Sequence, residues 1–445
     1  MTEYVTIEKE VYETLLKIAE EYKDLKIRVE ELEKRLWIYE NPNVPPSKKM
    51  NDEKKKEEKK PQEKRGAPEG HLGATRKQPK PNRFIDLKPD HCDKCGNNAI
   101  KVTGHESKIV EDIRIEKVVT QFTWYTYRCD CCGEERITMH PELPREGIFG
   151  PTISGIWNSL HYKGNIPFDR LSQISGNLFD MEITPGGLHN VIYRTAQIFE
   201  PTFDEVKDEI AVSPYVRSDE TSYPFNGDKW WLWNLSNQNS TLVVIRASRG
   251  SDVLVECLED GRYRIINSDC FSAYDKFLAD YQKCWAHILR YADKAAEYDP
   301  YAKKVHEMLV EMFVYIKMVK EKGLEGTPEV RRHIGIMKGK IGRLRVNKRR
   351  HIFANRLVGR LKKYNDSWFW CLIYKYVEPT NNISEGDIRK NVLARKISGQ
   401  HRSELGVHSR EIMMTMLLTN QRRGVNSFDF MNQEIRRYNS GYVGS

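Results

Sequence analysis

Apolar residues follow different periods along the chain, and the changes of period divide it into segments. At the start, apolar residues recur alternately four and three positions apart over about four heptads, which is typical of a coiled coil. Because the seam is narrow, a coiled-coil helix over residues 1–40 is favoured over an amphipathic helix packed on the rest of the chain. The seam positions are Val11, Leu15, Ile18, Tyr22, Leu25, Val29, Leu32 and Leu36.

A polar segment and a helical segment come next. Residues 41–88 are rich in Lys, Glu, Pro and Gly with almost no large apolar side chains, which predicts a basic flexible linker. Residues 143–210 have helical periodicity broken by polar turns. This pattern fits a helix-turn-helix DNA-binding domain, whose second helix begins after Thr184–Pro185, and a plain helical connector equally well.

From Ser213 the pattern becomes strand-like. The runs SPYVRSDE, KWWLWNLSN and STLVVIRAS are followed by a helix that begins at Ser251 and by a further strand, YRIINSD. A three-strand meander, a crossover helix and a parallel strand beside the first is the order of a ribonuclease-H-like sheet. We therefore expect the first part of such a core over residues 211–285. Asp219 and Asp269 would then lie at the ends of neighbouring strands.

The remainder of the chain is helical in character. Residues 286–374 predict an all-α insertion, and part of it, 331–364, is rich in Lys and Arg with no Asp or Glu. Residues 375–400 predict a helix that carries Glu385 and belongs to the core, and residues 401–445 predict a C-terminal helical tail. We expect DNA contacts from Arg343, Arg345, Lys348, Arg349, Arg350, Arg389 and Lys396.

Two cysteine motifs between residues 89 and 142 predict a metal site. HCDKCG and RCDCCGEE are CxxC knuckles, each followed by Gly and separated by the strand-like run DIRIEKVVTQFTWYTYR. Four thiolates in this arrangement form a closed tetrahedral site, so we expect a structural zinc-ribbon-like module. Its predicted ligands are Cys92, Cys95, Cys129 and Cys132, with Cys131 and His91 as alternatives.

The distribution of charge along the chain indicates what kind of partner the protein binds. The net charge of +9 is concentrated in the linker and in the basic part of the insertion. Two basic segments on a mildly acidic body indicate a polyanion such as DNA. The sequence contains no signal peptide and no apolar run of membrane-spanning length, so we expect a cytoplasmic protein without a membrane partner.

Three acidic residues are the candidates for chemistry. Asp219 and Asp269 at adjacent strand ends, with Glu385 in the first turn of a helix, can together hold a pair of divalent cations. Each acid alone is more commonly a turn residue, a cap or a partner of the helix dipole. Cys284 and His287, three residues apart at an apolar helix start, favour a packed structural pair over a metal or nucleophile site.

At these residues the chain resembles the transposases of the insertion-sequence 66 family. The resembling stretches are Asp219–Glu220–Thr221 with the following WWLW, then SDCFSAYDKF, CWAHILRYADKAAE and TNNISEGDIRKNVLARKISG with the later LLTNQRRGVNSFDFMNQ. The coiled coil, the NPNVPPSKK and APEGHLGATR stretches and the cysteine-rich segment also resemble that family's layout, so the resemblance spans nearly the whole chain.

The resemblance implies a bacterial, nucleoid-associated DDE transposase. Asp219, Asp269 and Glu385 would be its catalytic triad, with two Mg²⁺ or Mn²⁺ ions per active site and a structural Zn²⁺. The enzyme would cut transposon ends and join them to target DNA, as a homodimer or higher oligomer formed through the coiled coil and on DNA. The fold would be a multidomain α+β one with a ribonuclease-H-like core.

The sequence departs from the family pattern at two positions. Cys270 stands where Gly is common, and Gly386 stands where Arg is common, which removes one charge next to Glu385. Two other functions remain open at this point. One is a catalytically inactive DNA-binding protein derived from a transposase, and the other is a ribonuclease-H-fold nuclease without strand transfer.

Overall fold

The computed structural model describes residues 18, 21–22, 79–98, 101, 103–258, 264–347 and 349–441. It divides the chain into two units, Met1–Asp112 and Ile113–Ser445. Ile18 and Glu21–Tyr22 are helical, but the rest of the predicted coiled coil and most of the linker lie outside the described residues. The division falls inside the predicted zinc module, so its two knuckles are described separately.

The second unit begins with a small hairpin. Strands β1 (Thr126–Arg128) and β2 (Glu135–Ile137) pair antiparallel around the second knuckle. The strand-like expectation for the run before it was wrong over most of its length, because residues 111–125 form no regular structure. Val118 and Val119 remain exposed there, so the burial that stabilises a strand of alternating apolar residues is missing.

A helical segment precedes the main sheet. It consists of α3 (Pro151–Asn158), a π-helical turn (Ser159–Lys163), α4 (Phe168–Phe179), α5 (Pro185–Gln197) and α6 (Glu200–Ala211). Helix α5 begins after Thr184, as the sequence predicts. The Thr184 hydroxyl caps it by accepting a hydrogen bond from the Gly187 N–H at 3.1 Å.

Five strands form a mixed sheet in the order β5-β4-β3-β6-β7. Strands β3, β4 and β5 are an antiparallel meander, and β6 and β7 add parallel to β3. The predicted meander, crossover helix and parallel strand are all present, and β7 is an additional strand. The bounds are β3 Tyr215–Phe225, β4 Asp228–Ser236, β5 Thr241–Arg246, α7 Asp252–Cys257, β6 Ile265–Ser268 and β7 Asp280–Lys283.

Strand β3 is longer than the sequence indicated. We expected it to end at Asp219, but it continues to Phe225 and pairs with β4 throughout. The hairpin closes at Asn226 and Gly227, which both have positive φ, as a two-residue turn of this kind requires. Asp219 therefore lies within a strand and not at its end.

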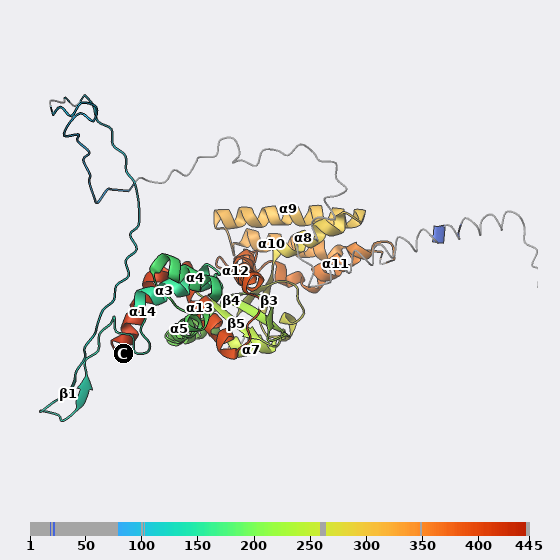
Figure 1. Cartoon of the computed structure of the whole chain (residues 1–445). Coiled ribbons are helices and arrows are strands. Elements are labelled where there is room, and N and C mark those ends of the chain that lie inside the picture. Colours follow the sequence, from blue (N-terminus) through green and yellow to red (C-terminus); the bar gives the residue numbers. More distant parts are fainter. Residues whose placement is uncertain are drawn as a thin grey trace, which may run out of the picture. The chain divides into compact units, whose positions relative to one another are not determined.

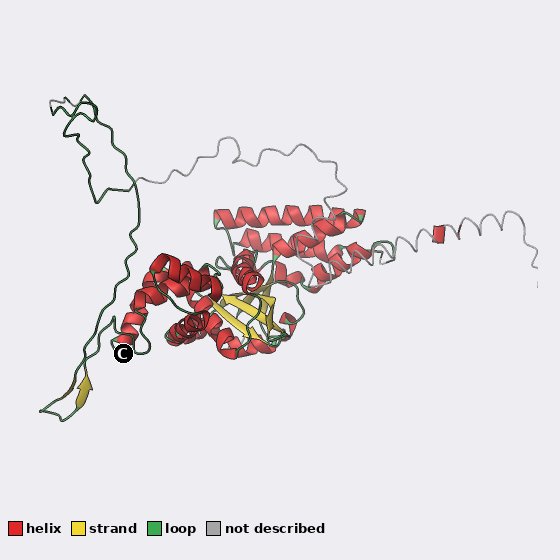
Figure 2. Ribbon diagram, in the orientation of Figure 1, coloured by secondary structure: helices red, strands yellow, loops and turns green. Residues whose placement is uncertain are grey.

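Helices cover both faces of the sheet (Figures 1 and 2). Alternation along the strands produces this arrangement, because neighbouring residues point to opposite faces. Tyr215 and Ile265 belong to one hydrophobic cluster, whereas Val216 and Ile266, the next residue of each strand, belong to the other.

The first of these clusters contains the all-α insertion. Its helices are α8 (Trp285–Ala296), α9 (Pro300–Lys322), α10 (Pro328–Arg343) and α11 (Ile352–Lys363), followed by 3₁₀ turns at Asn365–Trp368 and Trp370–Leu372. Residues of all four helices are buried together with Tyr215 and Ile265. The insertion therefore packs directly on the sheet.

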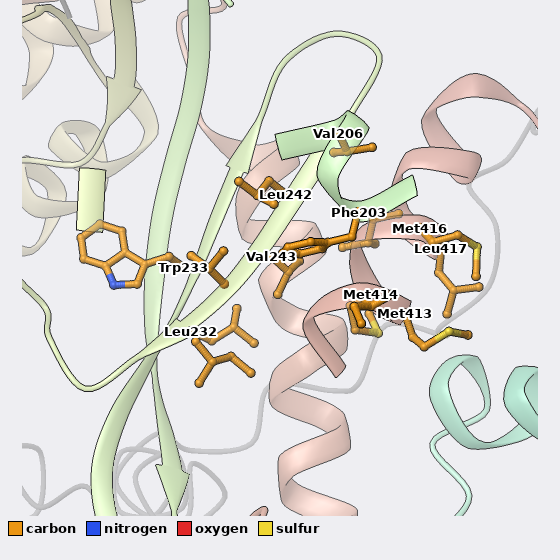
Figure 3. Packing of buried hydrophobic residues seen from close by; sticks show 14 of the residues in the cluster. Phe203, Val206, Leu232, Trp233, Leu242, Val243, Met413, Met414, Met416 and Leu417 are labelled. Carbon is orange, nitrogen blue, oxygen red and sulfur yellow. The ribbon is translucent and has the colours of Figure 1, made fainter. Parts of the chain in front are cut away.

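The last helices are α12 (Asn382–Ser398), α13 (Glu404–Arg423) and α14 (Ser427–Asn439). The expectation of a C-terminal tail was wrong for α13, because all its residues from Gly406 to Asn420 except His408 are buried. Its Met413, Met414 and Leu417 pack with β4, β5 and α6 in the main core (Figure 3). A helix that is apolar on most sides belongs inside the protein.

Helix α13 also satisfies the outer edge of the sheet. The backbone N–H groups of Thr241 and Val243 donate to the hydroxyls of Thr419 and Thr415 at 3.1 and 3.0 Å. The N–H of Ile245 donates to a Glu411 carboxylate oxygen at 2.5 Å. Four residues of a helix rise about 6.0 Å and two residues of a strand about 6.6 Å, so the two spacings match. The edge strand is thus covered by side chains instead of another strand.

Candidate functional site

The three predicted acidic residues come from three elements. Asp219 lies in β3, Asp269 follows β6 directly, and Glu385 lies in the first turn of α12. Burial, together with the negative charges of Glu220, Asp269 and Glu385, raises the pKa of Asp219 to about 7. The fold therefore brings the three carboxylates into one electrostatic neighbourhood.

Strand register explains why Asp219 and Asp269 meet. The parallel pairing of β3 with β6 ends at Arg217 and Asn267. Asp219 and Asp269 each lie two residues beyond this last pair, so they occupy equivalent positions where the two strands separate. Strand β3 does not end at Asp219 as expected, but Asp219 and Asp269 still lie at corresponding positions of neighbouring strands.

The turn after β6 fixes the position of Asp269. One oxygen of its carboxylate, Oδ1, accepts a hydrogen bond from the Phe271 N–H at 2.8 Å. Its main-chain carbonyl accepts one from the buried ammonium of Lys283 at 2.9 Å. Asp269 is therefore a turn residue, and its Oδ2 takes no part in that turn bond.

Glu385 is placed by the start of α12. Asn381 precedes the helix, but its side chain forms no capping hydrogen bond. The Asn381 amide instead donates to the Ser218 carbonyl at 2.8 Å, and the Asn381 N–H donates to the Cys284 sulfur at 3.2 Å. These two bonds tie α12 to β3, one residue before Asp219, and to the start of α8.

Two residues of α8 contact the Glu385 carboxylate. Arg290 Nη2 donates to Oε1 at 2.8 Å, and His287 Nε2 lies 3.5 Å from the same oxygen. Burial lowers the pKa of His287, and the Glu385 charge opposes this effect. The donor atoms of Cys284, His287 and Glu385 lie within 4.8 Å of one another, so this group could also hold a metal. The sequence favoured a packed pair for Cys284 and His287; Cys284 is indeed buried, but His287 faces the site.

Sequence reasoning did not single out Glu220 as a site residue. Its buried carboxylate accepts hydrogen bonds from Arg249 Nη2 and from the Tyr274 hydroxyl, both at 2.8 Å. Burial raises the pKa of Glu220, whereas these two partners lower it. The only signal in the sequence was its place beside Asp219. This signal was weak, because alternation in a strand turns neighbouring side chains to opposite faces.

The predicted DNA-binding residues are solvent-exposed. Arg343 ends α10, Arg345, Arg349 and Arg350 lie in the connection to α11, and Arg389 and Lys396 lie on α12. Within the described part of the chain none of these six forms an ion pair with a carboxylate. The charges of these six residues are therefore open to a polyanion. Lys348 lies outside the described residues.

Each cysteine knuckle has the same local geometry. The N–H groups of Gly96 and Gly133 donate to the carbonyls of Cys92 and Cys129 at 2.7 and 2.8 Å. Both glycines have positive φ, 71° and 72°. Backbone N–H groups of the following residues lower the pKa of Cys92 and of Cys129, which favours the thiolate that binds metals.

Comparison with known proteins identifies the family. Residues 146–409, more than half of the chain, match the model of the IS66 transposase family. No curated protein matches the chain. Among the described residues no helix is both long and apolar enough to cross a bilayer. The chain belongs to the IS66 family of transposases, and this membership indicates an enzyme that binds and processes DNA.

Proposed function

We propose that this transposase cuts transposon ends and joins them to target DNA by two-metal phosphoryl transfer at Asp219, Asp269 and Glu385. The observation that carries the proposal is the convergence of these carboxylates from β3, the end of β6 and the start of α12, where burial and then repulsion raise the pKa of Asp219 to about 7. The strand order β5-β4-β3-β6-β7 supports a ribonuclease-H-like core.

The donor set fits Mg²⁺ or Mn²⁺. All three side chains offer hard oxygen ligands, and a partly buried cluster of like charges is stabilised by a cation. Two ions bound there would activate the attacking oxygen and stabilise the charge on the leaving one. The chain's own residues position the ligands: Lys283 holds the Asp269 turn, and Asn381 holds the start of α12.

The other predicted ligands and partners complete the proposal. Cys92, Cys95, Cys129 and Cys132 would hold a structural Zn²⁺, supported by the equal geometry of the two knuckles. The exposed arginines between α10 and α11, with Arg389 and Lys396, would contact the DNA backbone. The coiled coil would pair two subunits, each on one transposon end.

Strand transfer by purified protein tests the function. Labelled transposon ends are incubated with Mg²⁺ or Mn²⁺ and a target plasmid, and cut and joined products are measured separately. Asp269→Asn should abolish both products while DNA binding and the thermal unfolding midpoint stay unchanged. The matched control is Asp293→Asn, an exposed carboxylate of α8, which should retain activity.

The outcomes separate the alternatives. Joining by Asp269→Asn would refute the assignment of the triad. Cut ends that accumulate unjoined with the unaltered protein would indicate a nuclease, and absence of both cutting and Mn²⁺ binding would indicate an inactive DNA-binding protein.

A further inference from the structure

A hollow of about 440 Å³ lies directly beside Asp269. Its wall combines Arg249 from the connection between β5 and α7, the turn after β6, one side of α8 and a single arginine of α11. This volume is in the range of about 300–1,000 Å³ that is typical of small-ligand sites. Of the three acidic residues only Asp269 lines it, so most of its wall is available to another group.

Two arginines supply positive charge to this hollow. Arg249 is held in place, because its Nε and Nη2 both donate to Glu220 Oε1, at 3.0 and 2.8 Å. Arg360 is different: within the described residues it forms no ion pair with a carboxylate. It is half-buried, and its guanidinium lies 4.5 Å from the centre of the Tyr291 ring. A partly desolvated cation without an acidic partner is suited to an anionic group of a ligand.

Flat groups make up much of the remaining wall. The Arg249 guanidinium lies 3.9 Å from the centre of the Phe271 ring, and Arg360 lies against Tyr291. Phe271 and Tyr291 are both only partly buried. Aromatic rings and guanidinium planes are the surfaces on which unpaired bases stack, whatever the base. The hollow thus joins an anion-binding cation with stacking surfaces.

We propose that this hollow binds one unpaired nucleotide of the DNA strand that is cut at the carboxylates. Arg360 contacts the phosphate of this nucleotide, and its base stacks against the rings of Phe271 and Tyr291. The inference rests on the proposed function, because Asp269 lines the hollow and would place the nucleotide next to the scissile phosphate. Inorganic phosphate would occupy Arg360 alone and leave the rings unused.

Binding without cleavage tests the proposal separately from catalysis. The full chain is titrated in EDTA with two versions of one transposon-end duplex, blunt or with a three-nucleotide single-stranded flank that carries 2-aminopurine at its first unpaired position. The unaltered protein should bind the flanked duplex more tightly and change the 2-aminopurine fluorescence. Arg360→Gln and Tyr291→Ala should each weaken binding of the flanked duplex about tenfold and leave the blunt duplex unaffected.

Two further arginine variants serve as controls. Arg437→Ala removes an arginine of α14 that is paired with Glu434 and should change neither affinity, and Arg360→Lys should restore part of the flank preference. Equal affinity for both duplexes, or equal effects of Arg360→Gln on both, would overturn the inference. So would competition by millimolar inorganic phosphate that abolishes the preference without altering the fluorescence. A preference for the flanked duplex without any cleavage would instead refute the proposed function and support the nucleotide site in the hollow.

Discussion

The buried ammonium of Lys283 donates to the main-chain carbonyl of Asp269, with 2.9 Å between Nζ and the oxygen. The same ammonium donates to the Ser268 hydroxyl at 3.2 Å and lies 4.7 and 4.8 Å from the ring centres of Tyr281 and Tyr364. Burial lowers the pKa of Lys283. The Lys283 ammonium thus fixes the backbone that carries one proposed metal ligand.

Replacing this cation should affect metal binding more than folding. Lys283→Met leaves two oxygens without their donor but also removes the cost of burying a charge, so we expect the free energy of unfolding to change by less than about 1 kcal/mol. Affinity for Mn²⁺ should fall about tenfold, because an outer partner that orients a ligand is lost. Calorimetry and urea unfolding measure the two effects. The control is Lys276→Met, at an exposed lysine in the connection between β6 and β7. Unchanged Mn²⁺ affinity in Lys283→Met would contradict the prediction.

Arg290 should compete with a cation for Glu385. The 2.8 Å contact places a positive charge on a proposed ligand, but Arg290 is largely exposed, so the pair adds less than about 1 kcal/mol to stability. Arg290→Gln should therefore raise the affinity for Mn²⁺ about threefold and leave the unfolding midpoint unchanged. Lys294→Gln, one turn further along α8, should have no effect. A loss of affinity in Arg290→Gln would mean that Arg290 positions Glu385 instead of competing for it.

The buried His161 and the partly buried His401 should make stability depend on pH. Burial lowers the pKa of His161 to about 4 and that of His401 to about 3. Their contribution to stability is complete above the ordinary value of 6.5, and it is lost as the pH falls below 6.5, because only the unfolded chain takes up the proton. We expect a loss of about 1.4 kcal/mol per pH unit for each histidine between pH 6.5 and 4.

Urea unfolding at a series of pH values measures this loss. His161→Asn should have a shallower slope than the unaltered protein, whereas His105→Gln, at an exposed histidine, should reproduce the original slope. Equal slopes for His161→Asn and the unaltered protein would show that His161 takes up its proton in the folded state.

Zinc content should depend on both knuckles. Cys92→Ser and Cys129→Ser should each reduce bound zinc to background, because three remaining thiolates leave the coordination incomplete. Elemental analysis after dialysis gives the result. Cys131→Ser should retain zinc, and loss of zinc in this variant would make Cys131 a ligand in place of Cys132.

The sequence predicts the three acids as candidates because each stands at a recognisable point of the chain. Glu385 follows the polar turn Asn381–Asn382, and helix α12 begins there. The end of β3 was misplaced because Asp219–Glu220 resembles a turn, whereas Asn226–Gly227 is the stronger hairpin signal and agrees with the structure.

Other features depend on contacts between distant segments. Nothing near Lys283 in the sequence indicates that its ammonium is buried against the Asp269 carbonyl. Arg360 is one of many Lys and Arg residues in a basic run, and only the fold places it in the same hollow as Asp269. Helix α13 has apolar residues on most sides, which was the available signal that it is a core helix.

The edge of β5 has a consequence for synthesis on the ribosome. The strand is made early, but the side chains that cover its N–H groups, Glu411, Thr415 and Thr419, are made about 170 residues later. Glu385 also emerges late. A chain released before these residues would have an open sheet edge, prone to pair with other chains, and would lack the third acid. Premature termination should therefore yield insoluble protein, and not a partial enzyme that nicks its host's genome.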